Sequence, residues 1–422
     1  MRFYRRSIVV LALLVMLVQG ISAQETITLR WTTCCAQPDR HELFQTWARR
    51  YEARNPGVKI EWEYPAGSYG AVLTTRIAGG AAPDVMWIGG SYWQLYQGFA
   101  SLNDFAATNP TLQETMPSAF PLFTMNDQLG AAPYGMNTVV FFINQRILNE
   151  VGLPFPRTSW TWDDFIKMGK QLTRDINGDG IIDRFAFDFR SGGYDQTAVA
   201  WGSPPYAPDM KKVAFNNPVT AALMQIFADL MSGVHGQLWA PATTGTYAAQ
   251  LAGNGSVAMV AGGVWAIPTM RSLESDEWEA IPFPWLEYEG QRHRNSFASA
   301  EGWAVSTTTK YPEEARKFVA FLLEREQMNE FAQLGAIIPA QASVARSFFT
   351  PTSVKPQNMA AFLDALETAN PLVQYHPIGN EVLAAIRPVM NQLWAGQIPA
   401  TSALAQMETI ANQMLDEYWA DK

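Results

Sequence analysis

The sequence predicts an α/β protein with two domains, in which helices cover the faces of mainly parallel sheets. Segments with apolar residues at every second position alternate with segments whose apolar residues recur at helical spacing. Strand–helix–strand units of this kind form parallel sheets with right-handed crossovers. The chain has 422 residues and is 48% hydrophobic, which is enough for one large core or two medium-sized cores.

The first strand–helix–strand unit directly follows the N-terminal segment. Residues 27–31 alternate apolar and polar side chains, which is typical of a half-buried strand. Asp39, with Glu42 three residues later, can cap a helix, and Asn55-Pro56-Gly57 ends that helix. Residues 58–64 alternate again and predict the second strand of the unit.

The same alternation continues to the end of the chain. Further strands are expected at residues 83–88, 139–143 and 257–261. Further helices are expected at residues 69–79, 91–99, 162–172, from 312 onward and 404–418. Because ligands of open α/β sheets bind beyond the carboxyl ends of the strands, the loops after these strands are the expected binding region.

The N-terminal segment, residues 1–23, is typical of a secretory signal peptide. Three arginines precede an apolar run at residues 8–18, which is too short to span a bilayer comfortably. An uncleaved membrane anchor is the alternative. The formal net charge is −9, and loss of these arginines makes the mature chain more acidic. This acidity argues against nucleic acid or an anionic membrane as a partner, although solubility alone explains it equally well.

The two cysteines, Cys34 and Cys35, are adjacent. An exported protein meets oxidising conditions, so a disulfide between them is one prediction; free thiols or an intermolecular bridge are the others. No spacing typical of metal ligands surrounds them, and histidine is scarce. We therefore expect no zinc site and no cofactor.

Six passages of the chain carry a family resemblance through their order. They are 51–60 (YEARNPGVKI), 82–85 (APDV), 133–144 (PYGMNTVVFFIN), 152–165 (GLPFPRTSWTWDDF), 258–265 (AMVAGGVW) and 315–323 (ARKFVAFLL). Each passage alone is a weak signal. Together, along nearly all of the mature chain, they resemble the family 1 extracellular solute-binding proteins, the maltose-binding-like group.

The resemblance implies the two-lobe periplasmic binding protein fold of type II, with a ligand cleft between the lobes. The implied segments are 24–134 and 287–346 for the N-lobe, and 135–286 and 347–422 for the C-lobe. The resemblance also implies a monomeric receptor in the periplasm or at the extracellular surface. Such a receptor passes a sugar to the transmembrane subunits of an ABC permease.

A sugar site needs aromatic rings that stack on apolar sugar faces and polar groups that bind hydroxyls. Trp265 matches the family's stacking tryptophan, and Asn137 matches a cleft position beside the first crossing between the lobes. The expected ligand contacts are Trp265, Trp303, Glu301, Asn137, Ser91, Tyr92, Tyr194, Asp195 and Gln37. The competing interpretations are a core position for the tryptophans, a solvated acid for Glu301, a local turn bond for Asn137 and a helix cap for Ser91.

Residues 175–183 (DINGDGIID) resemble a calcium-binding loop. Asp175, Asn177, Asp179 and Asp183 supply oxygens at relative positions 1, 3, 5 and 9. Ala186 stands where such a loop needs its bidentate acid. The segment therefore predicts either a structural calcium site or a plain turn.

These patterns favour a transport receptor over an enzyme. A secreted carbohydrate-active enzyme needs two carboxylates around the scissile bond, and no local signature supports Glu301 with Asp195 as such a pair. A receptor for another polar solute, such as glycerol phosphate, is the other alternative. It needs basic groups in the cleft, and the sequence does not place Arg40, Arg76 or Arg292.

Overall fold

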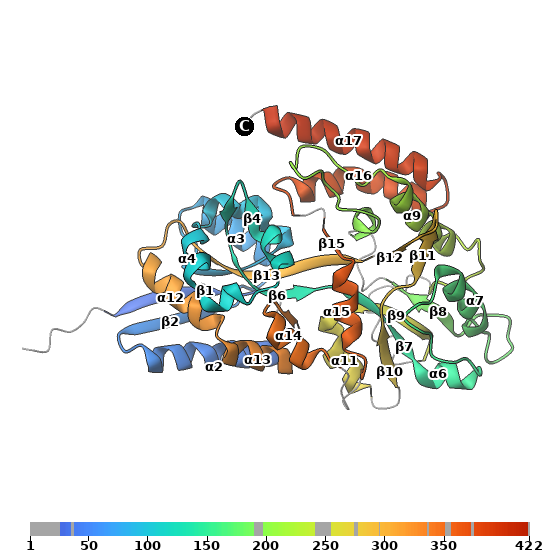
Figure 1. Ribbon diagram of the computed structural model, residues 1–422, viewed down its shortest axis with the longest axis horizontal. Helices are drawn as coiled ribbons and strands as arrows, with labels where there is room; N and C mark the ends of the chain where they lie inside the picture. The colour runs from blue at the N-terminus through green and yellow to red at the C-terminus, as the bar shows by residue number, and fades with distance from the viewer. Residues whose placement is uncertain are drawn as a thin grey trace, which may run out of the picture.

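Two helix-flanked sheets form two lobes that lie side by side along the long axis of the molecule (Figure 1). The computed structural model describes residues 26–34, 38–189, 197–240, 255–273, 277–294, 296–335, 337–350, 356–372 and 375–420. The two-lobe α/β architecture expected from the sequence is confirmed.

The N-lobe is built on a seven-stranded mixed sheet. Its strand order is β14 (Ile338–Pro339), β6 (Ala132–Asn137), β13 (Phe297–Val305), β3 (Val85–Gly89), β1 (Ile27–Thr32) and β2 (Val58–Glu63), and β15 (Asn370–Pro371) pairs with the start of β13. β1 is parallel to both β2 and β3, as the alternating pattern predicts. β13 is antiparallel to β3 and β6, so it runs back toward the N-lobe from the C-lobe side.

Helices cover both faces of the N-lobe sheet (Figure 1). The chain steps from β1 outward to β2 and then back across β1 to β3, so right-handed crossovers place α2 (Pro38–Arg54) and α3 (Tyr69–Ala78) on opposite faces. The other N-lobe elements are η1 (Gly90–Gly98), α4 (Asn103–Thr108), α5 (Pro110–Gln113), η2 (Pro117–Phe123), the hairpin β4 (Thr124–Met125) and β5 (Gln128–Leu129), α12 (Pro312–Leu322), α13 (Arg325–Gln333) and α14 (Ala342–Phe348). The helix expected at residues 91–99 is thus the 3₁₀ helix η1.

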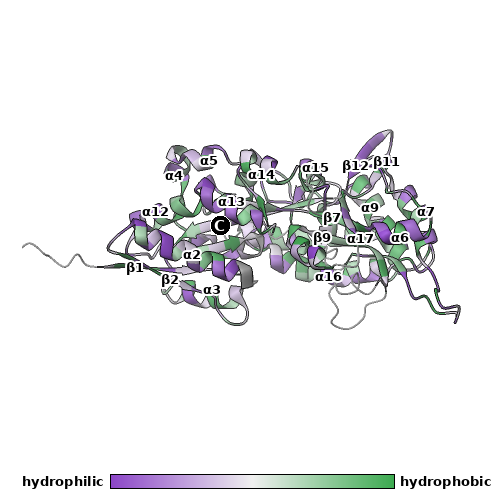
Figure 2. Cartoon of the chain, turned by 90° about the horizontal axis from the view of Figure 1, so that it is seen from below, coloured by the Kyte–Doolittle hydropathy of each residue, from purple (hydrophilic) through white to green (hydrophobic). Residues whose placement is uncertain are grey.

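The C-lobe is built on a four-stranded sheet in the order β10 (Trp278–Ile281), β7 (Val139–Asn144), β9 (Val257–Gly263) and β8 (Phe185–Asp188). Every residue of β7, β9 and β10 is buried. β7 and β9 are nearly continuous apolar runs without alternation, as expected of strands that are covered on both faces. Figure 2 shows β7 and β9 inside the lobe, with hydrophilic residues on outer elements such as α6 and α7. The C-lobe helices are α6 (Gln145–Glu150), α7 (Trp162–Leu172), η4 (Ala198–Ala200), α9 (Pro218–Met231), η5 (Val264–Ala266), α11 (Ile267–Ser272), α15 (Ala360–Glu367), α16 (Gly379–Trp394) and α17 (Ala400–Ala420).

The chain crosses between the lobes at adjacent points. β6 ends at Asn137 in the N-lobe sheet and β7 begins at Val139 in the C-lobe sheet, so Thr138 alone joins them. The return follows the hairpin β11 (Trp285–Tyr288) and β12 (Gln291–Arg294) and enters β13. The hydroxyls of Thr138 and Ser296 are 3.0 Å apart, so these two crossings touch. α14 contacts β14 of the N-lobe sheet, whereas α15 contacts β7 and β10 of the C-lobe sheet, so the chain passes between the lobes again between these two helices.

Two main hydrophobic clusters fill the protein. One runs through the N-lobe and onto one face of the C-lobe sheet, where Val140 and Phe142 belong to it; the other covers the opposite face of that sheet, and Trp265 and Leu372 pack against both clusters. Within the described ranges, no helix combines the length and the apolar character that crossing a membrane requires.

His376 lies in an aromatic cluster of the C-lobe. Its ring stacks on Tyr206 with 4.9 Å between centroids and meets Tyr418 and Trp419 edge-on. Its Nδ1 accepts a hydrogen bond from the backbone nitrogen of Ile378 at 3.2 Å. Burial lowers the pKa of His376 from 6.5 to about 4, so the folded protein holds this imidazole neutral.

We expect the free energy of unfolding to fall as the pH drops from 6.5 toward 4. In this window the unfolded chain binds a proton on residue 376 that the folded chain excludes, at a cost of about 1.4 kcal/mol per pH unit at most. The variant His376→Phe keeps an aromatic ring and should lose this part of the acid sensitivity. Urea unfolding at pH 7 and pH 4.5 measures the difference. Equal acid sensitivity in both proteins would contradict this role for His376.

Candidate functional site

A buried polar cluster lies where β3, β6 and β13 meet. Its centre is Glu301 of β13, which is 9% exposed. The partners of Glu301 on the neighbouring strands are Gly89 and Gly135, so neither strand places a side chain directly beside the carboxylate. Trp87 and Ile337 fill the space that side chains at these two glycines would occupy. The side chains that contact the carboxylate therefore come from other positions.

Four such groups converge on the Glu301 carboxylate. Trp87 Nε1 donates a hydrogen bond to Oε2 at 2.8 Å, and the Tyr134 hydroxyl donates to the same oxygen. Asn137 Nδ2 donates to Oε1 at 3.2 Å, and Arg40 Nη1 lies 3.7 Å from Oε2. The negative charge is therefore compensated by one guanidinium and three hydrogen bonds.

A β-bulge brings Tyr134 into this cluster. Glu301 opposes Gly135 on β6, whereas Gly302 opposes Pro133, so Tyr134 is the extra residue. A bulge of this kind redirects a side chain that regular alternation would place on the other face. Burial raises the pKa of the Tyr134 hydroxyl well above its ordinary value, and the Glu301 charge raises it further. Tyr134 therefore stays a hydrogen-bond donor.

Trp303 is a core residue, which corrects the expectation that it contacts a solute. Its side chain is 0% exposed. The ring stacks on Tyr134 with 4.7 Å between centroids and meets Trp31 and Phe44 edge-on. Trp303 is two residues from Glu301 on the same face of the strand, but it lies deeper in the N-lobe.

Tyr92 of η1 lies beside the cluster at the end of β3. Its ring meets Tyr69 at 5.4 Å and Trp87 at 5.5 Å, both edge-on. Partial burial raises the pKa of Tyr92, so its hydroxyl is a donor at neutral pH. Ser91 lies in the first turn of η1, and its side chain is outside the described part of the structure.

Trp265 lies at the junction of the lobes, in η5 directly after β9. Its ring covers Gly263, where a Cβ would lie 2.1 Å from a ring carbon. The ring is partly buried and packs against both core clusters. Gly263 pairs with Val139, two residues after Asn137, so the sheet register brings Trp265 toward the Glu301 cluster.

Three of the predicted contacts, Gln37, Tyr194 and Asp195, lie outside the described residues. Cys34 is buried and disulfide-bonded, whereas Cys35 lies outside the described residues.

A groove between the lobes, which we call the interlobe groove, is lined by residues that the sequence analysis did not single out. It consists of two adjoining pockets of about 610 and 410 Å³, which share Pro121, Pro208, Met210 and Tyr375. Its aromatic lining is Phe120, Tyr206, Tyr375 and Trp419. Gly302 faces Phe123 of η2, so the groove lies on the face of β13 opposite to Glu301. The clustered prolines of residues 204–208 were its only signal in the sequence.

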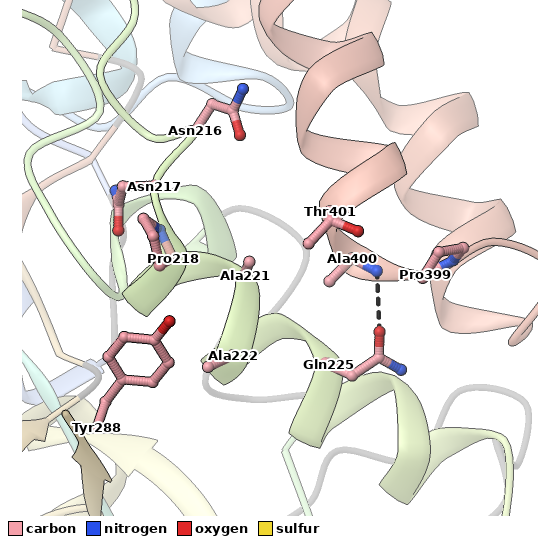
Figure 3. A pocket seen from close by; sticks show the side chains of 10 residues that line it. All are labelled: Asn216, Asn217, Pro218, Ala221, Ala222, Gln225, Tyr288, Pro399, Ala400 and Thr401. Atoms are coloured by element: carbon pink, nitrogen blue, oxygen red, sulfur yellow. Dashed lines mark hydrogen bonds between the residues drawn. The ribbon is translucent and has the colours of Figure 1, made fainter.

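A shallow pocket of about 660 Å³ lies on the C-lobe between α9 and the start of α17 (Figure 3). Two of its polar side chains, Gln225 and Asn217, already have partners. Gln225 accepts a hydrogen bond from the Ala400 amide at 2.9 Å, and Asn217 caps α9 by accepting from the Thr220 amide at 2.9 Å. We assign no ligand to this pocket.

The acidic segment 175–183 folds as a hydrogen-bonded turn. Asp175 accepts from two glycine amides, each at 2.7 Å, and Asp183 accepts from two further amides at 2.7 and 3.1 Å. These backbone bonds lower the pKa of Asp175. Asn177 and Asp179 each accept from a backbone amide as well. The oxygens thus point at the turn itself, and within the described ranges no three His, Cys, Asp or Glu side chains group so as to hold a metal ion.

Comparison with known proteins gives a family and a fold. The family model of the bacterial extracellular solute-binding proteins matches residues 46–361. An uncharacterized lipoprotein from the oleD 5′ region of Streptomyces antibioticus is 28% identical over 183 residues, which cover 39% of this chain and only 38% of that protein.

Solved structures of sugar-binding proteins share the fold at low identity. An ABC substrate-binding protein of Listeria monocytogenes, in complex with cycloalternan, has a TM-score of 0.76 at 18% identity and covers 93% of this chain and 100% of its own. The cyclic α-maltosyl-1,6-maltose binding protein of Arthrobacter globiformis has a TM-score of 0.75 at 17% identity, with coverages of 93% and 99%. The maltotriose-binding protein of Thermus thermophilus has a TM-score of 0.71 at 18% identity, with coverages of 92% and 100%.

Of the two alternatives for residues 175–183 we propose the plain turn, because backbone amides already donate to Asp175 and Asp183 and hold the turn closed. We expect the thermal unfolding midpoint to be the same in excess EDTA and in millimolar calcium. Differential scanning calorimetry of the purified protein checks this. A calcium-dependent rise that disappears in Asp175→Asn would show a structural calcium site instead.

Proposed function

The chain belongs to the bacterial extracellular solute-binding proteins, and on that premise we propose that it captures a sugar or oligosaccharide between its lobes for an ABC importer. As a member of this family it acts outside the cytoplasm. Closure of the lobes over the sugar would present the loaded form to the transmembrane subunits of the permease.

One observation carries the sugar assignment: the crossing at Thr138 has an indole ring on its C-lobe side and a polar cluster on its N-lobe side. Trp265 offers a flat apolar surface that packs against both cores. Asn137 and Glu301 supply polar groups across the crossing. Aromatic stacking combined with planar polar groups suits a molecule with apolar C–H faces and a rim of hydroxyls.

The solved structures support this choice. Proteins with the same fold were solved with cycloalternan, maltotriose and α-D-tagatose, all of which are neutral carbohydrates. Their identity to this chain is 15–18%, so they leave the particular sugar undetermined.

A phosphorylated solute fits less well, because the arginines considered for it are paired with carboxylates. Arg40 lies against Glu301 at 3.7 Å, and Arg76 pairs with Glu63. Arg292 pairs with Glu287 at 2.7 Å on the β11–β12 hairpin. A phosphate would have to compete with these partners.

Capture and release also need no catalytic group. An enzyme would need a second carboxylate across the bond from Glu301. Incubation of the bound oligosaccharide with the protein, followed by chromatography, should recover it intact.

The variant Trp265→Ala should bind sugar about tenfold more weakly or worse, because it loses an aromatic stacking surface worth roughly 1.5 kcal/mol. Thermal shift with maltose, maltotriose, tagatose and glycerol 3-phosphate first identifies the solute, and calorimetry then measures its affinity. Trp285→Ala, which removes a partly buried indole from the hairpin, is the matched control and should bind as the parent does.

Trp419→Ala tests the competing location. If this variant loses binding while Trp265→Ala keeps it, the solute lies in the interlobe groove and our site is wrong. A thermal shift with glycerol 3-phosphate and with none of the sugars would refute the sugar assignment.

A further inference from the structure

The Glu301 carboxylate has at most one acceptor position left for a solute, on Oε1. A carboxylate offers about four lone-pair sites. Here Trp87 and Tyr134 donate to Oε2, Asn137 donates to Oε1, and Arg40 lies against Oε2. Only 12% of the side chain is exposed. The acid is therefore better suited to holding its neighbours than to binding a solute hydroxyl itself.

The ionised carboxylate also dictates how the Asn137 amide is turned. A carboxylate only accepts hydrogen bonds, so Asn137 must face it with its NH₂ group. The Nδ2–Oε1 distance of 3.2 Å reflects this arrangement. Because the amide is planar, the carbonyl oxygen Oδ1 must then point away from Glu301.

Asn137 Oδ1 has no hydrogen-bond partner in the described part of the protein. The residue is 6% exposed, and the atom itself is enclosed. Buried acceptors without a partner are uncommon, because they lose water and gain nothing in return. This one is adjacent to Thr138, where the chain crosses between the lobes. The opening of the lobes that the proposed function requires would expose it to a solute.

We propose that Glu301 is a positioning residue that holds the Asn137 amide so that Oδ1 accepts a hydrogen bond from a solute hydroxyl. The inference rests on the proposed function and adds a selection rule to it. At this point the solute must donate. A hydroxyl satisfies Oδ1, whereas a phosphate oxygen or a deoxy carbon leaves it unpaired, so the site favours neutral, hydroxyl-rich sugars.

A double-mutant cycle tests whether Glu301 acts through Asn137. Maltotriose is the probe, or the sugar of the panel that binds the parent more tightly, and calorimetry gives its affinity for the parent, Glu301→Gln, Asn137→Ala and the double variant. A Gln at 301 can turn its own NH₂ toward Asn137 and allow that amide to flip. We expect Glu301→Gln and Asn137→Ala each to weaken binding about tenfold, and the double variant to bind no more weakly than Asn137→Ala.

Losses that add in the double variant would overturn the inference, because they would mean that Glu301 contacts the sugar directly. Unchanged affinity in a folded Glu301→Gln would overturn it as well. Asn137→Ala leaves Glu301 and its other hydrogen-bond donors in place. This variant therefore still tests the Asn137 Oδ1 acceptor if Glu301→Gln fails to fold. Full sugar affinity in Asn137→Ala would also contradict the proposal. If the parent protein binds none of the sugars, the proposed function itself is refuted. This result differs from the variant results above, which refute only the role of Glu301 and Asn137.

Discussion

One residue, Thr138, joins the central strands of the two sheets, and the positions of the candidate site residues depend on this short connection. The chain leaves the N-lobe sheet at Asn137 and enters the C-lobe sheet at Val139, and the returning strand passes beside it at Ser296. Strand register then fixes the positions on both sides. Glu301 and Asn137 come from paired strands of one sheet, and Trp265 follows the strand that pairs with Val139 in the other. Because the connection is so short, a rotation between the lobes must act on these side chains.

A buried charge stabilises the N-lobe side of the crossing only while its partners are present. Placing a carboxylate in a protein interior is costly, and the cost is offset here by Arg40 and three neutral donors. Arg40 is itself held over the ring of Phe331, 4.8 Å from the centroid. Loss of one partner would leave a poorly compensated charge. The cluster thus holds its side chains in place on the N-lobe side of the cleft, and Trp265 lies at the junction with the C-lobe.

Much of this fold follows from local patterns in the sequence. Alternating residues 27–31 and 58–64 became the parallel pair β1 and β2, and the continuous apolar run at 139–143 became a strand buried on both faces. The helix expected at residues 162–172 is α7, with the same bounds. These features depend on near neighbours, so the sequence shows them directly.

The site was less predictable because it depends on register between distant segments. Glu301 was singled out from the sequence, but its partners come from β3, β6 and α2, and a bulge that no local signal announces brings Tyr134 to it. β13 places Trp303 in the core, only two residues from Glu301. Trp303 was predicted to contact the solute, but its side chain lies in the core despite its closeness to Glu301 in the sequence. The spacing of residues 175–183 fitted either a calcium loop or a plain turn, and in the structure the Asp175 oxygens accept backbone amides.

The central claim is that the two lobes close on a sugar. Small-angle X-ray scattering of the full mature chain, with and without a saturating concentration of the sugar that binds, tests it most directly. Closure of the lobes should give a smaller radius of gyration in the bound state, and the sugar should be recovered unchanged. An identical scattering curve at saturation, or release of shorter sugars from the complex, would contradict it.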